Sequence, residues 1–259
     1  MIRQRIKKIY YCRDTLWDMS VRQFKLGFAG LKLGLWWAFI TPALLALSIN
    51  FVFTQVLKMN MPNYTLFVIS GIMPWFFMIN SLQEASVCFT ANLPILKQSV
   101  FPREFIPISV VIANLANFLL GFILFVPLFL MVKPAVLKVL ILIPLVVLSH
   151  GLFVLGMGLF LSSLNIFFRD LSRVLSIGFM VWFWVTPVFY SLDMLDTHYR
   201  WICIINPAAH YIIAYQNILF NGKLPPFAFL FSAPILSVIS LTGGLYFFIK
   251  KEPSMLKKI

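Results

Sequence analysis

The few titratable side chains that could carry out chemistry inside or beside apolar sequence are carboxylates and histidines. Asp193 and Asp196 stand three residues apart, and His198 and His210 follow them. Carboxylates at this spacing can exchange protons or bind a cation. Because the two aspartates stand in a short SLDMLD turn, we interpret them as solvated loop residues. His150 stands alone in a long apolar stretch, which is more typical of hydrogen-bonded packing than of a proton relay.

Motifs for catalysis, nucleotide binding and metal binding are absent from the sequence. It contains no G-x-x-x-x-G-K-[ST] phosphate-binding loop and no H-E-x-x-H pair. Its cysteines, Cys12, Cys88 and Cys203, form no Cys/His set with metal-ligand spacing and suggest no disulfide. We therefore predict no catalytic residue, no metal site and no cofactor bound by this chain. The chain is expected not to be an enzyme.

Long apolar stretches must position these residues. Hydrophobic residues make up 61% of the 259 residues and charged residues 11%, against about 45–50% and 25% in soluble domains. A membrane helix needs about 20 apolar residues. Six stretches have about this length, at 34–57, 64–82, 105–132, 139–164, 174–191 and 227–249. The sequence therefore predicts an all-α integral membrane protein with six transmembrane helices.

Basic residues are concentrated in every second gap between the six stretches. Sixteen of the 21 lysines and arginines lie before the first stretch, in the second and fourth gaps, or after the last stretch. An excess of lysine and arginine marks the cytoplasmic face of a membrane. We therefore predict a multi-pass protein with both termini in the cytoplasm. The net charge of +13 then reflects orientation in the bilayer and gives no reason to expect a nucleic-acid partner.

The predicted organisation has three parts: a cytoplasmic N-terminus (1–33), a six-span transmembrane domain (34–249) and a basic cytoplasmic tail (250–259). Residues 11–31 are too polar to insert, yet they carry one apolar stripe at helical spacing. The stripe consists of Trp17, Val21, Phe24 and Phe28. This pattern predicts an amphipathic helix in the membrane interface, acting either as an anchor or as a scaffold for a soluble partner.

The gap between the second and third stretches is long and contains exposed apolar residues. It includes a short segment, 91–99, bounded by turn-forming residues and followed by Phe-Pro-Arg-Glu at 101–104. Apolar side chains flanked by charges suggest a docking surface for another protein. The alternative is an interfacial helix buried among lipid head groups.

Residues 201–220 are long enough to span the membrane, but they contain amide groups and an Asn-Pro break at Asn206 and Pro207. Polar groups near the bilayer centre are costly. A seventh span would also place the tail lysines outside. We therefore predict two short re-entrant helices that dip in from the outer side, as at a gate, between spans five and six.

Aromatic residues are dense along the fifth stretch and in the re-entrant segment. Flat rings can stack on sugar rings without trapping a polymer. The candidate channel and gate residues are Phe179, Phe183, Tyr190, Asn206, Pro207, Tyr211 and Tyr215. The alternative for any single ring is a belt residue that faces lipid.

Several motifs occur together in a fixed order. They are LGLWW at 33–37, PNY and GIMPW at 62–64 and 71–75, FPRE at 101–104, LNIFFRDL at 164–171, FWVTPVFY at 183–190 and NP at 206–207. With these motifs the whole chain resembles the membrane (permease) subunit of type-2 ABC exporters of cell-surface polysaccharides, the O-antigen, teichoic-acid and capsule family. One departure is Leu26-Gly27-Phe28, where family members often carry a basic-aromatic pair.

The resemblance implies a transmembrane subunit of an ATP-driven exporter that moves a lipid-linked polysaccharide, most simply of O-antigen type, across the bacterial cytoplasmic (inner) membrane. The implied partners are a second copy of the chain and two copies of a cytoplasmic ABC ATPase subunit, which would use ATP and magnesium. The implied coupling residues are Asn92, Leu93, Pro94, Ile95, Leu96, Lys97, Phe101, Arg103 and Glu104. Alternatives are a membrane-embedded glycosyl- or acyltransferase and a secondary transporter.

Overall fold

The computed structural model describes residues 11–92, 102–168, 170–256 and 258. Within these residues the regular structure is helical, without a strand. The α-helices are α2 (Arg13–Phe28), α3 (Trp37–Asn50), α4 (Tyr64–Ala91), α6 (Phe105–Val132), α7 (Val136–Val139), α8 (Ile143–Phe167), α9 (Leu171–Val185), α10 (Arg200–Ile205), α11 (Pro207–Gln216) and α12 (Phe227–Leu256). Two π-helical turns, η2 (Phe51–Val56) and η6 (Asn217–Asn221), extend α3 and α11.

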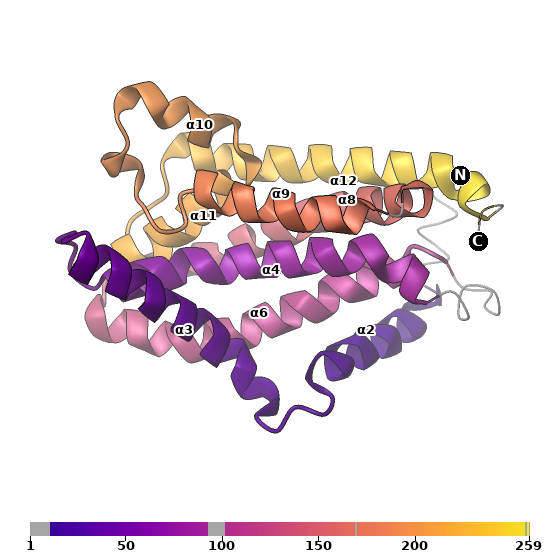
Figure 1. Cartoon of the computed structure of the whole chain (residues 1–259), viewed down its shortest axis with the longest axis horizontal. Coiled ribbons are helices and arrows are strands. Elements are labelled where there is room, and N and C mark those ends of the chain that lie inside the picture. The colour runs from indigo at the N-terminus through magenta and orange to yellow at the C-terminus, as the bar shows by residue number, and fades with distance from the viewer. Residues whose placement is uncertain (1–10, 93–101, 169, 257, 259) are drawn as a thin grey trace.

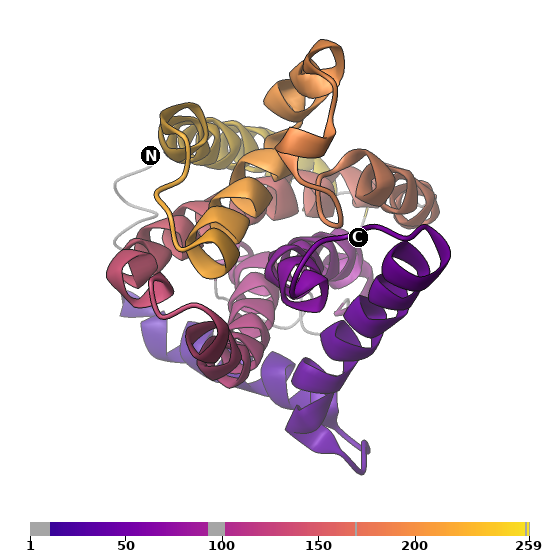
Figure 2. The same cartoon turned by 90° about the vertical axis from the view of Figure 1, so that its left-hand side faces the viewer.

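The long helices run side by side along the long axis of the molecule, with α2 and α3 splayed to one side (Figure 1). Helix α4 lies at the centre of the bundle, since most of its side chains are buried. The segment Gly34–Val56, in contrast, is largely exposed. The end-on view shows the other helices arranged around α4 (Figure 2). We call the end where α4 and α12 finish the tail end, and the opposite end the α10 end.

Five helical segments are long and apolar enough to cross a membrane: Gly34–Val56, Tyr64–Ala91, Phe105–Val132, Val136–Phe167 and Phe227–Met255. They confirm the prediction of an all-α membrane protein. The predicted fifth stretch instead forms the 15-residue helix α9, which is about 22 Å long and shorter than the roughly 30 Å hydrocarbon core. Helix α9 ends because Thr186 precedes Pro187 and is extended there. Six crossings remain a prediction.

Two helices continue past the ends that hydropathy predicts. Helix α4 reaches Ala91, and α12 reaches Leu256, so that the beginning of the predicted tail is helical. Tertiary packing explains both extensions, because a second apolar cluster forms at the tail end. In it, Phe89 of α4 packs near Phe248 of α12, with their ring centroids 6.0 Å apart, and Met255 is also buried.

The backbones of α8 and α12 cross at two glycines. A methyl group added at Gly244 would overlap the backbone of Gly156, and one added at Gly156 would overlap the backbone at Ser240. Close contact of this kind is typical of membrane helices with small residues at the crossing. Gly243, the neighbour of Gly244 in the chain, has nothing within 4 Å of such a methyl group.

Helix α2 forms within the segment where an amphipathic helix was predicted, but the face that it buries differs from the predicted apolar stripe. It packs along α6 (Figure 1), and its buried residue is Ser20. Trp17 is 67% exposed, whereas Phe24 and Phe28 are partly buried and contact each other edge to face at 5.2 Å. The predicted stripe therefore divides between the bundle and the outer surface of the helix.

Candidate functional site

The loop that follows α9 is fastened to α10 and α11 by Asn206. Its Oδ1 accepts hydrogen bonds from the indole Nε1 of Trp182, at 2.8 Å, and from the backbone nitrogen of Ala208, at 3.1 Å. Its Nδ2 donates to Oγ1 of Thr186 at 2.9 Å. One amide thus caps α11 and holds the end of α9. The predicted break at Asn206 and Pro207 is present, since Asn206 is extended and Pro207 opens α11.

A glycine and a glutamine hold the same loop against α4. Nε2 of Gln216 donates to the carbonyl oxygens of Pro187, at 2.8 Å, and Val188, at 3.2 Å. A Cβ atom at Gly71 would lie 2.7 Å from the Val188 oxygen and 3.0 Å from Nε2 of Gln216. Only glycine allows this approach. Together with Trp75, Trp182, Thr186 and Asn206, these two residues form what we call the Asn206 junction.

The junction brings three of the sequence motifs together. Trp75, from GIMPW, contacts Trp182 and Phe183, with ring centroids 5.7 Å apart in each case. Phe183 also lies near Phe189, and Phe189 near Tyr190, at 5.6 and 5.2 Å. Motifs distant in the chain therefore build one aromatic cluster at the α10 end of α4 and α9.

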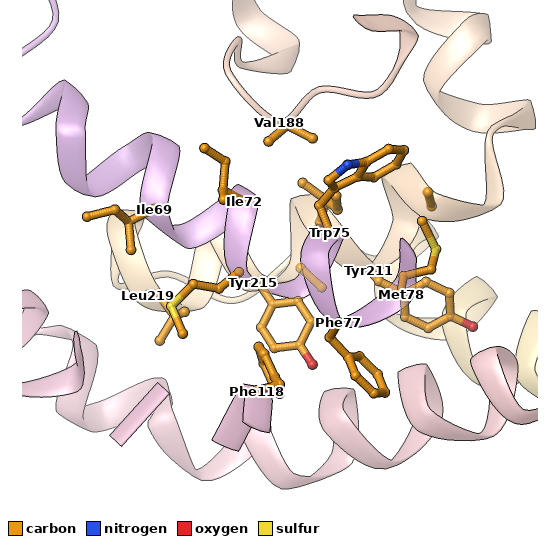
Figure 3. Packing of buried hydrophobic residues seen from close by; sticks show 14 of the residues in the cluster. Ile69, Ile72, Trp75, Phe77, Met78, Phe118, Val188, Tyr211, Tyr215 and Leu219 are labelled. Carbon is orange, nitrogen blue, oxygen red and sulfur yellow. The ribbon is translucent and has the colours of Figure 1, made fainter. Parts of the chain in front are cut away.

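The predicted channel residues fall into two groups. Phe179, Phe183 and Tyr190 lie on α9 or just after it; Phe179 is buried, and the other two are partly buried. Tyr211 and Tyr215 lie in the protomer core and have no exposed surface. Figure 3 shows Tyr215 beside Phe118 and Phe77 in the space between α4 and α6. The structure does not bring the two groups to one surface.

The core tyrosines surround His150. The imidazole stacks on Tyr211, with ring centroids 4.6 Å apart, and meets Phe77 edge-on at 5.1 Å. The hydroxyl of Tyr211 donates to the Ala233 carbonyl and lies 2.8 Å from Oγ of Ser237. This surrounding is aromatic and closed, as expected for a packing residue, but the predicted hydrogen bonding is not seen at Nδ1 of His150, which is buried without a hydrogen-bond partner among the described residues.

Helix α11 is enclosed by protein, whereas α10 is exposed. All residues of α11 after Pro207 are buried, but Ile204 and Ile205 of α10 are 61% and 72% exposed. His210 joins α11 to its neighbours, because Nε2 donates to the Ile204 carbonyl at 2.8 Å and Nδ1 accepts from Oγ of Ser232 at 2.6 Å. Burial lowers the pKa of His210, and the Ile204 hydrogen bond opposes part of that shift.

The two aspartates of the SLDMLD turn lie near the α10 end. Asp193 and His198 lie in two short 3-10 turns before α10, and Asp196 immediately precedes the second turn. Among the described residues, no group of three histidine, cysteine, aspartate or glutamate side chains could hold a metal ion.

The predicted coupling segment is described only at its edges. Asn92 follows the end of α4, where its Nδ2 donates to the Cys88 carbonyl at 2.8 Å. Arg103 pairs with Glu252 of α12 across 3.4 Å, and Glu104 is 4% exposed at the start of α6. The remaining predicted coupling residues, Leu93, Pro94, Ile95, Leu96, Lys97 and Phe101, lie outside the described residues.

Comparison with known proteins places the chain in a family. The family model "ABC-2 type transporter" matches residues 15–220. An O-antigen export system permease protein RfbA of Klebsiella pneumoniae is 33% identical over 215 residues, which cover 83% of each chain. A protein of the same name from Myxococcus xanthus is 29% identical over 256 residues, 98% of each chain. The long apolar helices and these matches lead to one conclusion: the chain is a multi-pass membrane protein that belongs to the ABC-2 type transporter family.

Proposed function

We propose that this chain is the transmembrane subunit of an ATP-driven ABC exporter that moves a lipid-linked O-antigen polysaccharide across the bacterial cytoplasmic membrane. The observation that carries the proposal is similarity along almost the whole chain to two proteins named O-antigen export system permease. The sequence contains no phosphate-binding loop, so ATP and magnesium belong to a separate ATPase subunit in this proposal.

The proposed topology has six crossings with both chain ends in the cytoplasm. Helix α9 together with the loop held by the Asn206 junction forms the fifth crossing. The arrangement of charge supports this orientation: α6 and α9 begin at the tail end, where α12 finishes (Figure 1), and basic residues stand at these helix ends, namely Arg103, Arg173, Lys250 and Lys251. Lysine and arginine favour the cytoplasmic side. The α10 end is then the outer end, and α10 and α11 are re-entrant.

The proposed coupling element is the connection between α4 and α6. It begins at Asn92, ends at Glu104, and joins the two helices at the tail end. The Arg103–Glu252 pair connects the beginning of α6 to α12, so that a push on this connection reaches a second helix. In this proposal the ATPase shifts the equilibrium between two conformations of the chain, because it binds one of them more tightly than the other.

A second copy of the chain completes the proposed transport path. Helix α9 presents an apolar outward face, formed by Val174, Ile177, Met180, Val181 and Trp184, each more than half exposed. In a homodimer, the path lies between the protomers, and Phe183 and Tyr190 supply rings on which sugars slide. Two ATPase subunits, one for each protomer, complete the assembly.

Loss of the chain tests the proposal directly. Deleting its gene should cause a lipid-linked glycan to accumulate inside the cell, and the same glycan should disappear from the cell surface. Purification of the tagged chain from native membranes should recover an ABC ATPase. A secondary transporter would purify without an ATPase, and a glycosyl- or acyltransferase would leave an unfinished glycan instead of a complete one.

A further inference from the structure

A cavity of about 230 Å³ opens where α2 and α3 cover the groove between α4 and α6. It lies within a single protomer and apart from the Asn206 junction. Glu84 of α4 lines it, and about 10 Å of helix separates this residue from the end of α4 at Ala91. On α4 the lining runs from Met73 to Glu84 and on α6 from Ala113 to Gly121, so the cavity lies beside the middle of both helices, with Glu84 on its side toward the tail end.

One wall of the cavity is polar. Nδ2 of Asn114 donates to Oε2 of Glu84 at 2.9 Å and to the Val110 carbonyl at 3.2 Å. Gln23 of α2 supplies a second amide beside the Glu84 carboxylate. Asn80 lies one turn before Glu84 on α4 and is exposed to the cavity. The side-chain oxygen of Asn117 is buried there and, within the described residues, has no hydrogen-bond partner.

Aromatic side chains also line the cavity. Phe24 and Phe28 reach the cavity from α2, Trp37 from the beginning of α3, and Phe76 from α4. Each of these rings is at least partly accessible. A cavity that combines flat rings with amides and a carboxylate can recognise one face of a sugar by stacking and its hydroxyls by hydrogen bonds.

The charge of the lining selects among ligands. Polar and ionisable groups at membrane depth are costly and mark ligand paths. Glu84 is the one ionisable residue among the described residues that line the cavity, and no lysine or arginine accompanies it there. A phosphate or pyrophosphate would meet a carboxylate without a compensating cation. A volume below the roughly 300–1,000 Å³ of pockets for drug-sized ligands admits one ring rather than a chain.

We propose that this cavity binds a single uncharged or amino sugar ring, held by Glu84 and Asn114 and stacked on the aromatic side chains that line it. Given the exporter function proposed above, on which the assignment of a role rests, the ring belongs to the lipid-linked substrate arriving from the cytoplasmic side. The sugar then has a binding site inside each protomer, separate from any path between protomers.

Thiol protection measures binding without requiring export. Thr41 is exposed and lines the cavity from α3, so Thr41→Cys provides a reporter at its rim. Cys12→Ser removes the accessible native thiol, while Cys88 and Cys203 are buried. The full chain, purified with the ATPase that accompanies it and placed in lipid nanodiscs, is labelled with a polar maleimide. The labelling rate is measured with methyl glycosides of glucose, galactose, mannose and N-acetylglucosamine, and separately with glycerophosphoethanolamine.

At least one methyl glycoside should slow labelling of the reporter in a saturable manner, and glycerophosphoethanolamine should not. Glu84→Gln and Asn114→Leu should each raise the half-protecting concentration about tenfold, the effect of losing one hydrogen bond to a charged group. Thr90→Ala is the matched control, because Thr90 lies on α4, does not line the cavity, and is exposed, with its hydroxyl donating to the Val87 carbonyl. It should leave protection unchanged.

Absence of protection by every glycoside overturns the sugar site. Glu84→Gln preserves the shape of the side chain. If this variant is protected as well as the protein with Glu84, the glycoside binds elsewhere and the sugar site is also overturned. Protection by glycerophosphoethanolamine alone assigns the cavity to a lipid head group. These outcomes are independent of the gene deletion: intracellular glycan without protection contradicts only the sugar site, and protection without intracellular glycan contradicts only the exporter.

Discussion

The indole of Trp182, in the last turn of α9, donates a hydrogen bond of 2.8 Å to Oδ1 of Asn206, in the extended residue between α10 and α11. The same amide caps α11 and reaches Thr186. This relationship links the end of the proposed fifth crossing to the enclosed helix of the α10 end. The two segments are therefore held together, because separating them would leave the Trp182 indole N–H and Nδ2 of Asn206 without these partners, while the Thr186 hydroxyl would still donate to the Trp182 carbonyl.

Asn206→Ala should destabilise the protein by about 2–4 kcal/mol, since it removes a helix cap and leaves the indole N–H of Trp182 unpaired. Asn206→Asp should have a smaller effect, because it retains both accepted bonds and loses only the donated one. The measurement is the midpoint of thermal unfolding in detergent. Asn221→Ala is the control, since Nδ2 of Asn221 makes one long bond of 3.3 Å. Equal midpoints for Asn206→Ala and Asn221→Ala would contradict the role of the junction.

Gly71→Ala should disturb the loop after α9. The new methyl group would lie 2.7 Å from the Val188 oxygen, so the loop must shift and the bonds from Gln216 must lengthen. We expect a loss of about 1–3 kcal/mol, typical of overpacking, together with reduced export. Gly151→Ala is a matched control on α8, where a methyl group meets nothing within 4 Å. It should be neutral, or stabilising by up to about 1 kcal/mol through helix propensity.

Gly244→Ala should force α12 away from α8, because the added methyl group overlaps the backbone of Gly156. Removing this overlap requires movement of two whole helices. We therefore expect that the purified variant either aggregates or loses at least about 3 kcal/mol of stability. Gly243→Ala, one residue earlier on the same helix, places the same methyl group in open space. If both variants behave alike, the glycine crossing does not hold the two helices together.

Introducing a negative charge tests the docking surface that the sequence predicts. Leu96→Asp or Phe101→Asp in the connection between α4 and α6 should weaken recovery of the ATPase about 30-fold or more, the effect of losing one interface hot spot of about 2 kcal/mol. ATPase-driven export should fall in parallel. Lys223→Asp, an exposed change at the α10 end, should leave ATPase recovery unchanged. Normal recovery and export in the Leu96 and Phe101 variants would favour burial of this segment in lipid head groups.

The sequence predicted those features of the structure that neighbouring residues determine. The Asn-Pro pair at Asn206 and Pro207 predicts a break, because asparagine caps a helix and proline opens one, and the structure has both. Long apolar runs predict the helices in the same way. Pro187 marks the end of α9 in the sequence, but the position of the loop after it was not predictable, since Gly71 and Gln216, which hold this loop, lie far from it in the sequence.

The cavity lined by Glu84 and Asn114 could not be predicted from the sequence either. Glu84 reads as the first residue of a polar gap because apolar sequence ends near it. In the structure α4 continues, and Glu84 faces Asn114 of α6. The signal was a pair of polar residues one turn apart on each of two apolar helices, but a single sequence does not show that the two pairs meet.

The two groups of predicted channel rings should respond differently to truncation. Tyr211 and Tyr215 have no exposed surface, so replacing either with alanine should destabilise the protein by about 3–5 kcal/mol, as for other large buried aromatic residues. Phe183 and Tyr190 are only partly buried, and Phe183→Ala with Tyr190→Ala should slow export while ATPase activity and unfolding temperature change little. The comparison is informative because loss of export through misfolding would lower the unfolding temperature as well. Normal export by the Phe183 and Tyr190 double variant would mean that these rings face lipid, and the path for sugar would then have to be sought on another face of α9.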